Sequence, residues 1–190
     1  QHEVEYTLKT WGCRPFEWFK RHRLLGKRFY FAHCIHLNEE EIAQMAETGT
    51  GVAHCPISNM LLSSGACPVP SYLEHGLTRI GLGVDGAASS NSSNMLEEIR
   101  CAYLLNRLTW GDKAATPDDY LYMATAGGAK VLGRDDIGYL APGMAADFAQ
   151  MDWNQLTYAG GCYDPVACIV ESGDPRLVKN VVVNGELVVS

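Results

Sequence analysis

The sequence predicts an α/β fold of parallel strand–helix units, followed by a smaller β-rich segment. As far as residue 135, short apolar runs alternate with helical stretches, which is typical of parallel βα units. After residue 135, turn residues and short β-type runs replace this alternation, and the dipeptide Asn184-Gly185 between VVV and ELVV indicates a hairpin. We therefore expect two parts, residues 1–135 and residues 136–190.

Three apolar runs are expected to form the strands of the first part. They are RFYFAHC at 28–34, GVAHC at 51–55 and TRIGLGVDG at 78–86. A nearly uninterrupted apolar run suits a parallel strand that is buried on both faces. Such strands place functional side chains at their carboxyl ends, both in a closed (β/α) barrel and in an open doubly wound sheet. The pattern alone leaves these two architectures open.

Helices are predicted between and around these strands. Their signals are apolar periodicity, an opening cap or proline, and a closing glycine. The stretch PISNMLLSSGACP is predicted to be a loop, and DPVACIVES to be part of the β-rich segment. The predicted helices cover residues 2–22 with an interruption at Pro15, 38–49 with Asn38 as the cap, 69–76, 95–110, and a stretch that opens at Pro117.

The number of strands bears on the architecture. A (β/α) barrel needs eight strands and about 250 residues, whereas this sequence of 190 residues has three such runs. The choice is between a short open sheet and the C-terminal part of a larger chain. The missing initiator Met and the helical start favour the second interpretation.

The composition excludes several classes of function. A formal net charge of -7 and the lack of a Lys/Arg run argue against nucleic-acid binding. No apolar stretch approaches the roughly 20 residues that span a bilayer. The seven cysteines come without a secretion signal or a Cys-x-x-Cys pair. We therefore expect reduced, mostly buried thiols in a cytoplasmic protein.

Polar side chains stand at the end of each predicted strand, namely His33, His54 and Asp85. Parallel strands share an edge at their carboxyl ends, which is where active sites are built in this fold class. Asp85, His33 and His54 are therefore the candidate functional residues of this edge, because a carboxylate and an imidazole can both exchange protons. The alternatives are an Asx-turn or helix cap for Asp85, a hydrogen-bonded core histidine for His33, and a bracing role for His54.

The neighbouring polar residues give weaker signals. Ser58, Asn59 and Ser89 offer hydroxyl and amide groups at the same end of the strands, and such groups can bind the edges of a polar, planar substrate. Turn chemistry is the alternative for each of them. Cys34 and Cys55 directly follow histidines, and neighbours in a strand point to opposite faces. We expect these thiols to pack behind the site rather than to act as nucleophiles.

Longer motifs resemble a known family. AHCIHLNEEEIAQMAETGTGVAHCPISNMLLSSG, GLGVDGAASSNSSNMLEEIR and GYLAPGMAADF are similar to the amidohydrolase superfamily, in the branch of cytosine, guanine, S-adenosylhomocysteine and chlorotriazine hydrolases. Within this branch, SSNMLEEIRCAYLLNRL, GRDDIGYLAPGMAADFA and YAGGCYDPVA look most like 8-oxoguanine deaminases.

The resemblance implies a metal-dependent (β/α)8 TIM barrel, flanked by a β-sandwich that both chain ends build. The three predicted strands would be the sixth, seventh and eighth strands of the barrel, and residues 136–190 would be a small β-sandwich segment. The family's His-x-His pair on the first strand and its histidine and glutamate on the fifth strand have no counterpart in this sequence. The expected fold is thus the C-terminal part of the barrel with its sandwich segment.

The resemblance also implies a mechanism. One divalent metal ion, zinc in the first place and iron as the alternative, would hold a hydroxide. Asp85 would ligate the metal and take the proton of the attacking water, and His33 would orient that water. The implied reaction is hydrolytic deamination of an aminated N-heterocycle with release of ammonia, best matched to 8-oxoguanine or a guanine-like purine.

Two other interpretations stay open. One is a chlorotriazine, cytosine or S-adenosylhomocysteine-type hydrolase on the same scaffold. The other is an inert or assembly-only fragment, because the ligands of the first and fifth strands are absent. We expect a small N-heterocyclic substrate, no nucleic-acid or membrane partner, and a homo-oligomer.

Overall fold

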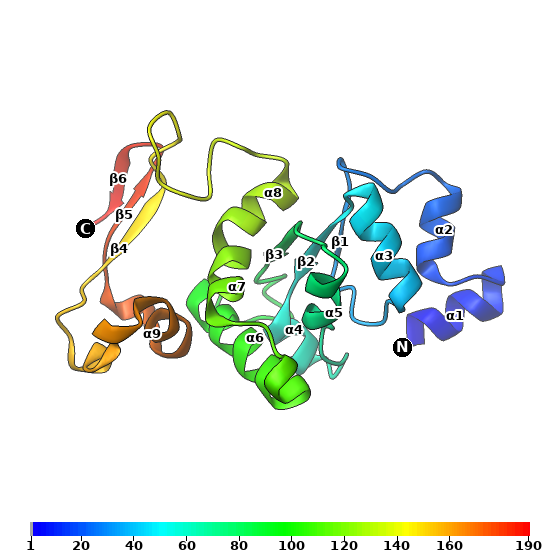
Figure 1. Cartoon of the computed structure of the whole chain (residues 1–190), viewed down its shortest axis with the longest axis horizontal. Helices are drawn as coiled ribbons and strands as arrows, with labels where there is room; N and C mark the ends of the chain where they lie inside the picture. The colour runs from blue at the N-terminus through cyan, green and yellow to red at the C-terminus, as the bar shows by residue number, and fades with distance from the viewer. Residues whose placement is uncertain (1) are drawn as a thin grey trace.

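A parallel three-stranded sheet lies in the middle of the molecule, in the order β1-β2-β3 (Figure 1). The structure, a computed structural model, describes residues 2–190 apart from the side chain of Cys162. The strands are β1 (Tyr30–Ala32), β2 (Gly51–His54) and β3 (Ile80–Leu82). Each is shorter than its apolar run, but the α/β class and the parallel βα pattern are confirmed.

The register of this sheet brings the ends of its strands to one edge. β1 and β3 both pair with β2 in parallel. Beyond β1, the His33 N–H donates a 2.8 Å hydrogen bond to the Ala53 carbonyl. Beyond β3, the Gly83 N–H donates a 2.8 Å hydrogen bond to the His54 carbonyl. The segments that follow the three strands therefore all begin at the carboxyl edge of the sheet.

Helices join the strands in the way that parallel pairing requires. The connection from β1 to β2 is α3 (Glu39–Thr48), and the connection from β2 to β3 contains α4 (Pro56–Leu61) and α5 (Val69–Glu74). The start and end predicted for the first of these helices are confirmed. The Asn38 side chain accepts from the Glu41 N–H in a capping box, and Gly49 ends the helix in a left-handed conformation at φ +71°.

The remaining helices lie to either side of the sheet (Figure 1). Pro15 restarts the N-terminal helix, as the sequence predicts. No helix within residues 2–190 has the length and apolar character needed to cross a membrane. The helices are α1 (His2–Trp11), α2 (Pro15–Arg21), α6 (Met95–Trp110), α7 (Pro117–Tyr122), α8 (Gly128–Leu132) and α9 (Pro165–Ser172), with a π-helical turn at Met123–Gly127 and 3-10 turns at Gly111–Lys113, Leu156–Tyr158, Gly161–Tyr163 and Pro175–Leu177.

One prediction about burial is wrong. The run at 28–34 was expected to form a strand covered on both faces, yet Tyr30 and Ala32 are exposed and Phe31 is half-buried. Among residues 2–190, β1 pairs on one side only, with β2, and its other side has no strand beside it in this chain. β2 (Gly51–His54) lies between two neighbouring strands. Its residues are buried or half-buried, as expected.

Two predictions of secondary structure are also wrong. The stretch predicted as a loop after β2 begins with α4, where Pro56 occupies the first helical position and needs no N–H partner. The stretch DPVACIVES forms α9 rather than β structure, because Asp164 caps it by accepting from the Ala167 N–H. In both cases a proline reads as a turn in the sequence but opens a helix in the structure.

The core lies between the sheet and its helices. Val52 of β2 is 0% exposed and Ile80 of β3 is 1% exposed, so the middle of the sheet is sealed from solvent. Helices from both sides contribute to the same cluster, and even α9 from the C-terminal segment adds a residue. The cluster comprises Phe16, Ile42, Met45, Val52, Cys67, Val69, Tyr72, Leu77, Ile80, Ile99, Ala102, Ala115, Tyr120, Met123 and Val170.

The C-terminal segment contains a second sheet, which is antiparallel and lies apart from the first (Figure 1). Its hairpin turns at Asn184 and Gly185, both at positive φ, as the sequence predicts. α9 contacts α6 and α7, which ties the segment to the first core. The division at residue 135 stays a prediction. The strands are β4 (Phe148–Met151), β5 (Val178–Val183) and β6 (Glu186–Val189).

Glycines allow the helical segment after α7 to lie directly on β3. A Cβ at Gly127 would be 2.3 Å from the Ile80 carbonyl oxygen, and a Cβ at Gly81 would be 2.8 Å from Cα of Gly128. Such contacts are impossible for any residue with a side chain. The close approach therefore fixes β3, and with it the start of the loop that carries Asp85.

Gly127→Ala should lower the free energy of unfolding by about 1–3 kcal/mol, because the added methyl group pushes against the backbone of β3. Gly128→Ala is the matched control. Its Cβ would meet nothing closer than the Met123 carbonyl oxygen at 3.5 Å, so helix propensity should leave stability unchanged or raise it by up to about 1 kcal/mol. Urea unfolding followed by circular dichroism measures both, and equal effects would contradict the packing role of Gly127.

Candidate functional site

The two candidate catalytic residues meet at the carboxyl edge of the parallel sheet. His33 follows β1 directly, and Asp85 lies in the loop beyond β3. Nε2 of His33 is 3.8 Å from Oδ2 of Asp85. Their side chains are 39% and 31% exposed, so both are accessible from solvent. The edge thus brings together an imidazole and a carboxylate that are far apart in the sequence.

The backbone is strained at these two positions. φ is +64° at His33, +51° at Cys34 and +59° at Asp85, in the left-handed region that residues with a side chain seldom adopt. Asp and His tolerate this region better than most residues do. Strain of this kind persists where the surrounding structure imposes it, and it concentrates at functional sites. Both candidate residues therefore have side-chain directions that an ordinary strand end would not give.

The Asp85 carboxylate is held by three donors. Oδ2 accepts hydrogen bonds from Oγ of Ser58 at 2.5 Å and from Oγ of Ser89 at 2.9 Å. Oδ1 accepts from the Gly86 N–H at 2.8 Å. The Ser58 hydroxyl first, and then the other two donors, lower the pKa of Asp85 below its usual value. The residue is thus kept as a carboxylate, with an orientation fixed from both sides.

His33 is oriented by Asn59. Nδ1 of His33 lies 2.8 Å from Oδ1 of Asn59. An amide oxygen only accepts hydrogen bonds, so Nδ1 carries the proton in this arrangement. The other ring nitrogen, Nε2, is left to face Asp85 and can accept or donate a proton there. The contact therefore fixes both the tautomer and the plane of the imidazole.

One short helix supplies both orienting side chains. Ser58 and Asn59 are consecutive residues of α4, which starts at the end of β2, between His33 on one side and Asp85 on the other. They are 0% and 1% exposed. The sequence predicts substrate binding for Ser58, Asn59 and Ser89, and that role stays a prediction. The structure places all three against the candidate catalytic groups.

His54 lies under the same edge as a neutral side chain. It is 2% exposed, and its Nδ1 has no hydrogen-bond partner among the residues that the structure describes. Burial, and then the nearby His33, lower the pKa of His54 to about 4. A buried, uncharged imidazole fits the wall of the site better than a proton-transfer role at neutral pH.

The two cysteines that follow histidines are not activated. Cys34 is half-buried against the core cluster, and Cys55 is buried. Burial raises the pKa of Cys34 to about 12 and that of Cys55 to about 11. Raised pKa values disfavour the thiolate at neutral pH, so packing behind the site stays the expected role of these two cysteines.

Sequence reasoning missed a buried carboxylate that supports the site. Oε2 of Glu98, on α6, accepts from the Ile57 N–H at 3.1 Å, and Oε1 accepts from Oγ of Ser90 at 3.2 Å. The signal was available, because Glu98 lies on the same helical face as the buried residues Ala102 and Asn106. A charged residue on the apolar face of an amphipathic helix indicates a specific partner.

The fit of this edge to a metal ion is incomplete. Asp85 is a carboxylate that can serve as one metal ligand, and its exposed side chain is open to a further bond. Within residues 2–190, however, no three His, Cys, Asp or Glu side chains group closely enough to hold a metal ion. The side chains described can therefore supply one ligand but not a whole metal site.

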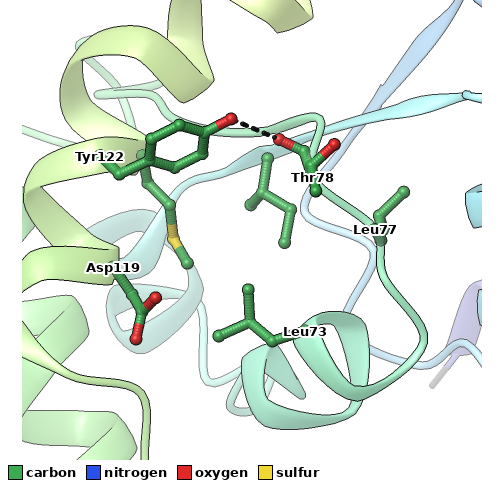
Figure 2. Close-up of a pocket in the computed structure, with 7 residues that line it drawn as sticks. Leu73, Leu77, Thr78, Asp119 and Tyr122 are labelled. Carbon is green, nitrogen blue, oxygen red and sulfur yellow. Dashed lines mark hydrogen bonds between the residues drawn. The ribbon is translucent and has the colours of Figure 1, made fainter.

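A separate cavity lies at the opposite end of β3 (Figure 2). Its volume is about 180 Å³, and its walls are mostly apolar. Tyr122 closes one side by donating to the Thr78 carbonyl, as Figure 2 shows. Asp119 is the one carboxylate in the wall, and it already accepts from Thr116 in a capping box. The cavity lacks the chemistry of the His33–Asp85 edge.

Comparison with known proteins decides the family. Residues 1–188 match the amidohydrolase family. The chain belongs to this family. The superfamily resemblance that the motifs carry is thereby confirmed, and so is the view of this amidohydrolase chain as part of an amidohydrolase domain.

The curated relatives of this amidohydrolase chain are named for reactions on different substrates. It is 45% identical over 168 residues to an 8-oxoguanine deaminase of Pseudomonas aeruginosa, which covers 88% of this chain and 37% of that protein. It is 40% identical over 189 residues to a hydroxydechloroatrazine ethylaminohydrolase of Pseudomonas sp. (strain ADP), which covers 98% and 39%. The chain thus spans about two fifths of the length of these curated relatives.

A solved structure gives the same picture. An adenosine deaminase from Xanthomonas campestris with bound zinc superposes with a TM-score of 0.94 at 31% identity. The match covers 99% of this chain and 43% of that one. The arrangement of both sheets and their helices is therefore that of an amidohydrolase domain, over the part that the two chains share.

The buried His54 should make stability depend on pH. Between pH 6.5 and 4 the unfolded chain binds a proton at this residue that the folded chain does not, so stability falls as the pH falls. We expect a loss of about 2 kcal/mol between pH 7 and pH 5. His54→Leu should remove this loss in urea titrations, whereas His2→Gln, an exposed control, should keep it. An unchanged pH dependence in His54→Leu would contradict the burial of a neutral imidazole.

Proposed function

We propose that this chain supplies the Asp85 and His33 side of the active site of a metal-dependent hydrolase that deaminates an aminated N-heterocycle. The observation that carries the proposal is the pair itself, a carboxylate and an imidazole 3.8 Å apart at the carboxyl edge of a parallel sheet, each held by its own hydrogen bonds. Of the substrates that the relatives' names mention, 8-oxoguanine or a guanine-like purine is our first choice. The relative at 45% identity supports it.

The proposal includes an architecture. β1, β2 and β3 would be the sixth, seventh and eighth strands of a (β/α)8 barrel, and residues 136–190 would be a segment of a β-sandwich beside it. The parallel order of the three strands and the separate antiparallel sheet are compatible with this assignment. Since the side chains described hold no complete metal site, the proposal concerns this chain within a protein that carries the rest of that site, called here the complete enzyme.

The metal would be one divalent ion, with zinc ahead of iron. Asp85 would be its ligand from this chain, and the other ligands would be residues other than those described. The zinc in the related adenosine deaminase structure supports this choice. When bound, a divalent ion lowers the pKa of coordinated water to about 7, which makes a nucleophile available at neutral pH.

Asp85 and His33 would transfer the proton of the attacking water and orient that water. The lowered pKa of Asp85 keeps its carboxylate ionised, and an ionised carboxylate beside the attacking water can accept a proton and pass it on to the leaving amine. Nε2 of His33, 3.8 Å from the Asp85 carboxylate, carries the free lone pair in this tautomer and could orient that water by accepting a hydrogen bond from it. The fixed tautomer of His33 keeps Nε2 available for this role.

Two other functions remain as alternatives. A triazine hydrolase would use the same edge with another leaving group, and the relative from Pseudomonas sp. (strain ADP) favours it. A purely structural role in assembly would leave Asp85 and His33 without chemistry, and the incomplete ligand set favours that view. A panel of aminopurines, aminopyrimidines and chlorotriazines separates the enzymatic alternatives.

Asp85→Asn in the complete enzyme should reduce kcat to less than about a tenth of the original rate, because the amide is a poor ligand and cannot accept the proton. His33→Asn should also lower kcat strongly while most of the metal stays bound. Turnover and metal content, measured together, test both variants. Retention of kcat in Asp85→Asn would exclude its role as proton acceptor, and loss of the metal in His33→Asn would make His33 a ligand.

The substrate panel is expected to show ammonia release from 8-oxoguanine or guanine and no turnover of chlorotriazines. Ammonia and chloride release are measured on the same preparation, loaded with zinc. Activity on chlorotriazines alone would overturn the choice of purine. A complete enzyme that binds zinc in a one-to-one ratio but turns over no member of the panel would favour the assembly role.

A further inference from the structure

Glu98 is a carboxylate that solvent does not reach. It is 0% exposed and lies on the face of α6 that also buries Ile99, Ala102 and Asn106. Burial raises the pKa of this carboxyl group. A carboxylate in such a place is costly, and an apolar side chain of similar size would usually serve packing better. Packing alone therefore does not account for a glutamate here.

The two oxygens of Glu98 hold two different segments. Oε2 accepts from the backbone N–H of Ile57 at 3.1 Å, and Oε1 accepts from Oγ of Ser90 at 3.2 Å. Ile57 belongs to the first turn of α4, directly before Ser58. Ser90 lies in the loop after β3, directly after Ser89. The Glu98 carboxylate therefore links the first turn of α4 to the loop after β3 through these two hydrogen bonds.

The same two segments carry the side chains that orient the site. Ser58 and Ser89 donate to Asp85, and Asn59 contacts His33. Each of the three orienting residues is one or two positions from an atom that the buried carboxylate holds. A shift of either segment would change the distance and angle between the carboxylate and the imidazole at the edge.

We propose that Glu98 is a positioning residue for the reaction at this edge, which joins the first turn of α4 to the loop after β3 and thereby sets Asp85 against His33. The inference rests on the proposed function, because positioning affects a rate only if these two residues act. Glu98 itself transfers no proton, and it acts through Ser58, Ser89 and Asn59. Its removal should therefore lower kcat more than it changes KM.

Three single variants of the complete enzyme separate the effects of the charge of Glu98, of its hydrogen bonds and of a substitution elsewhere on α6. Glu98→Gln can still accept from the Ile57 N–H and can donate to Oγ of Ser90, so kcat should stay within about threefold. Glu98→Leu fills the same space without either bond, and kcat should fall by about 10- to 100-fold with KM within about threefold. Glu97→Ala, at an exposed neighbour on the same helix, is the control and should leave both unchanged.

A double-variant cycle tests the route of the effect. If Glu98 acts through α4, Glu98→Leu should lower kcat by a much smaller factor in an enzyme that already carries Ser58→Ala. The first substitution has then already removed the orientation of Asp85 that the second would disturb. Full multiplication of the two losses would overturn the proposal, and so would a Glu98→Leu enzyme with kcat within threefold of the original. Should Glu98→Leu fail to fold, Ser90→Ala removes one of the two contacts and should lower kcat by about 3- to 10-fold.

Hydrogen exchange on the chain itself gives a readout that does not need activity. The Asn59 N–H donates to the Cys55 carbonyl at 3.0 Å and reports the first turn of α4, whereas the Ile42 N–H reports α3. In Glu98→Leu, protection of Asn59 should fall at least tenfold while Ile42 is unchanged, and Glu98→Gln should retain both. Unchanged protection of Asn59 would overturn the inference.

The two kinds of failure are distinguishable. If the original complete enzyme turns over no substrate of the panel, the proposed function fails, and the exchange experiment still decides whether Glu98 orders α4. If the original enzyme is active and Glu98→Leu keeps its kcat, the proposed function stands and the positioning role is wrong.

Discussion

The site depends on one constraint, the position of α4 at the end of the middle strand. Because β2 lies between β1 and β3 in a parallel sheet, the residues that follow it emerge between the residues that follow its neighbours. Ser58 and Asn59 are consecutive residues of α4, and they contact Asp85 and His33 respectively. Without α4 at this place, the carboxylate and the imidazole would be oriented only by strained loops.

This arrangement costs stability and has to be offset by packing around it. Left-handed backbone at His33 and Asp85 and the unpartnered Nδ1 of buried His54 are each unfavourable. The offsetting interactions lie below the edge, where the sealed strands β2 and β3, the glycine contact of the π-helical turn and the buried Glu98 hold the site from behind. Side chains of functional sites are generally held in place by well-packed secondary structure and supporting hydrogen bonds around them.

Membership of the amidohydrolase family and the geometry of the edge agree, but they carry different information. The family accounts for the shared arrangement of sheets and helices, which superposes on a zinc-bound relative over almost the whole chain. The edge itself shows which groups this chain contributes, a fixed carboxylate and an imidazole of fixed tautomer, together with one potential metal ligand. Glu98 does not contact Asp85 or His33 directly; it links two segments whose side chains do so, through the Ile57 N–H and the Ser90 hydroxyl.

The sequence by itself determined the class of fold and marked three strand ends, His33, His54 and Asp85, two of which the structure brings face to face at the edge. Apolar runs, caps and turn dipeptides are local signals, and the strand ends marked by His33 and Asp85 follow from them directly. Only the tertiary structure decided that β2 lies between β1 and β3, that Pro56 and Pro165 open helices, and that Ser58 and Asn59 contact the candidate catalytic groups. It also revealed Glu98 as the link between two segments. These features depend on contacts between residues far apart in the chain, which periodicity and local propensity cannot register.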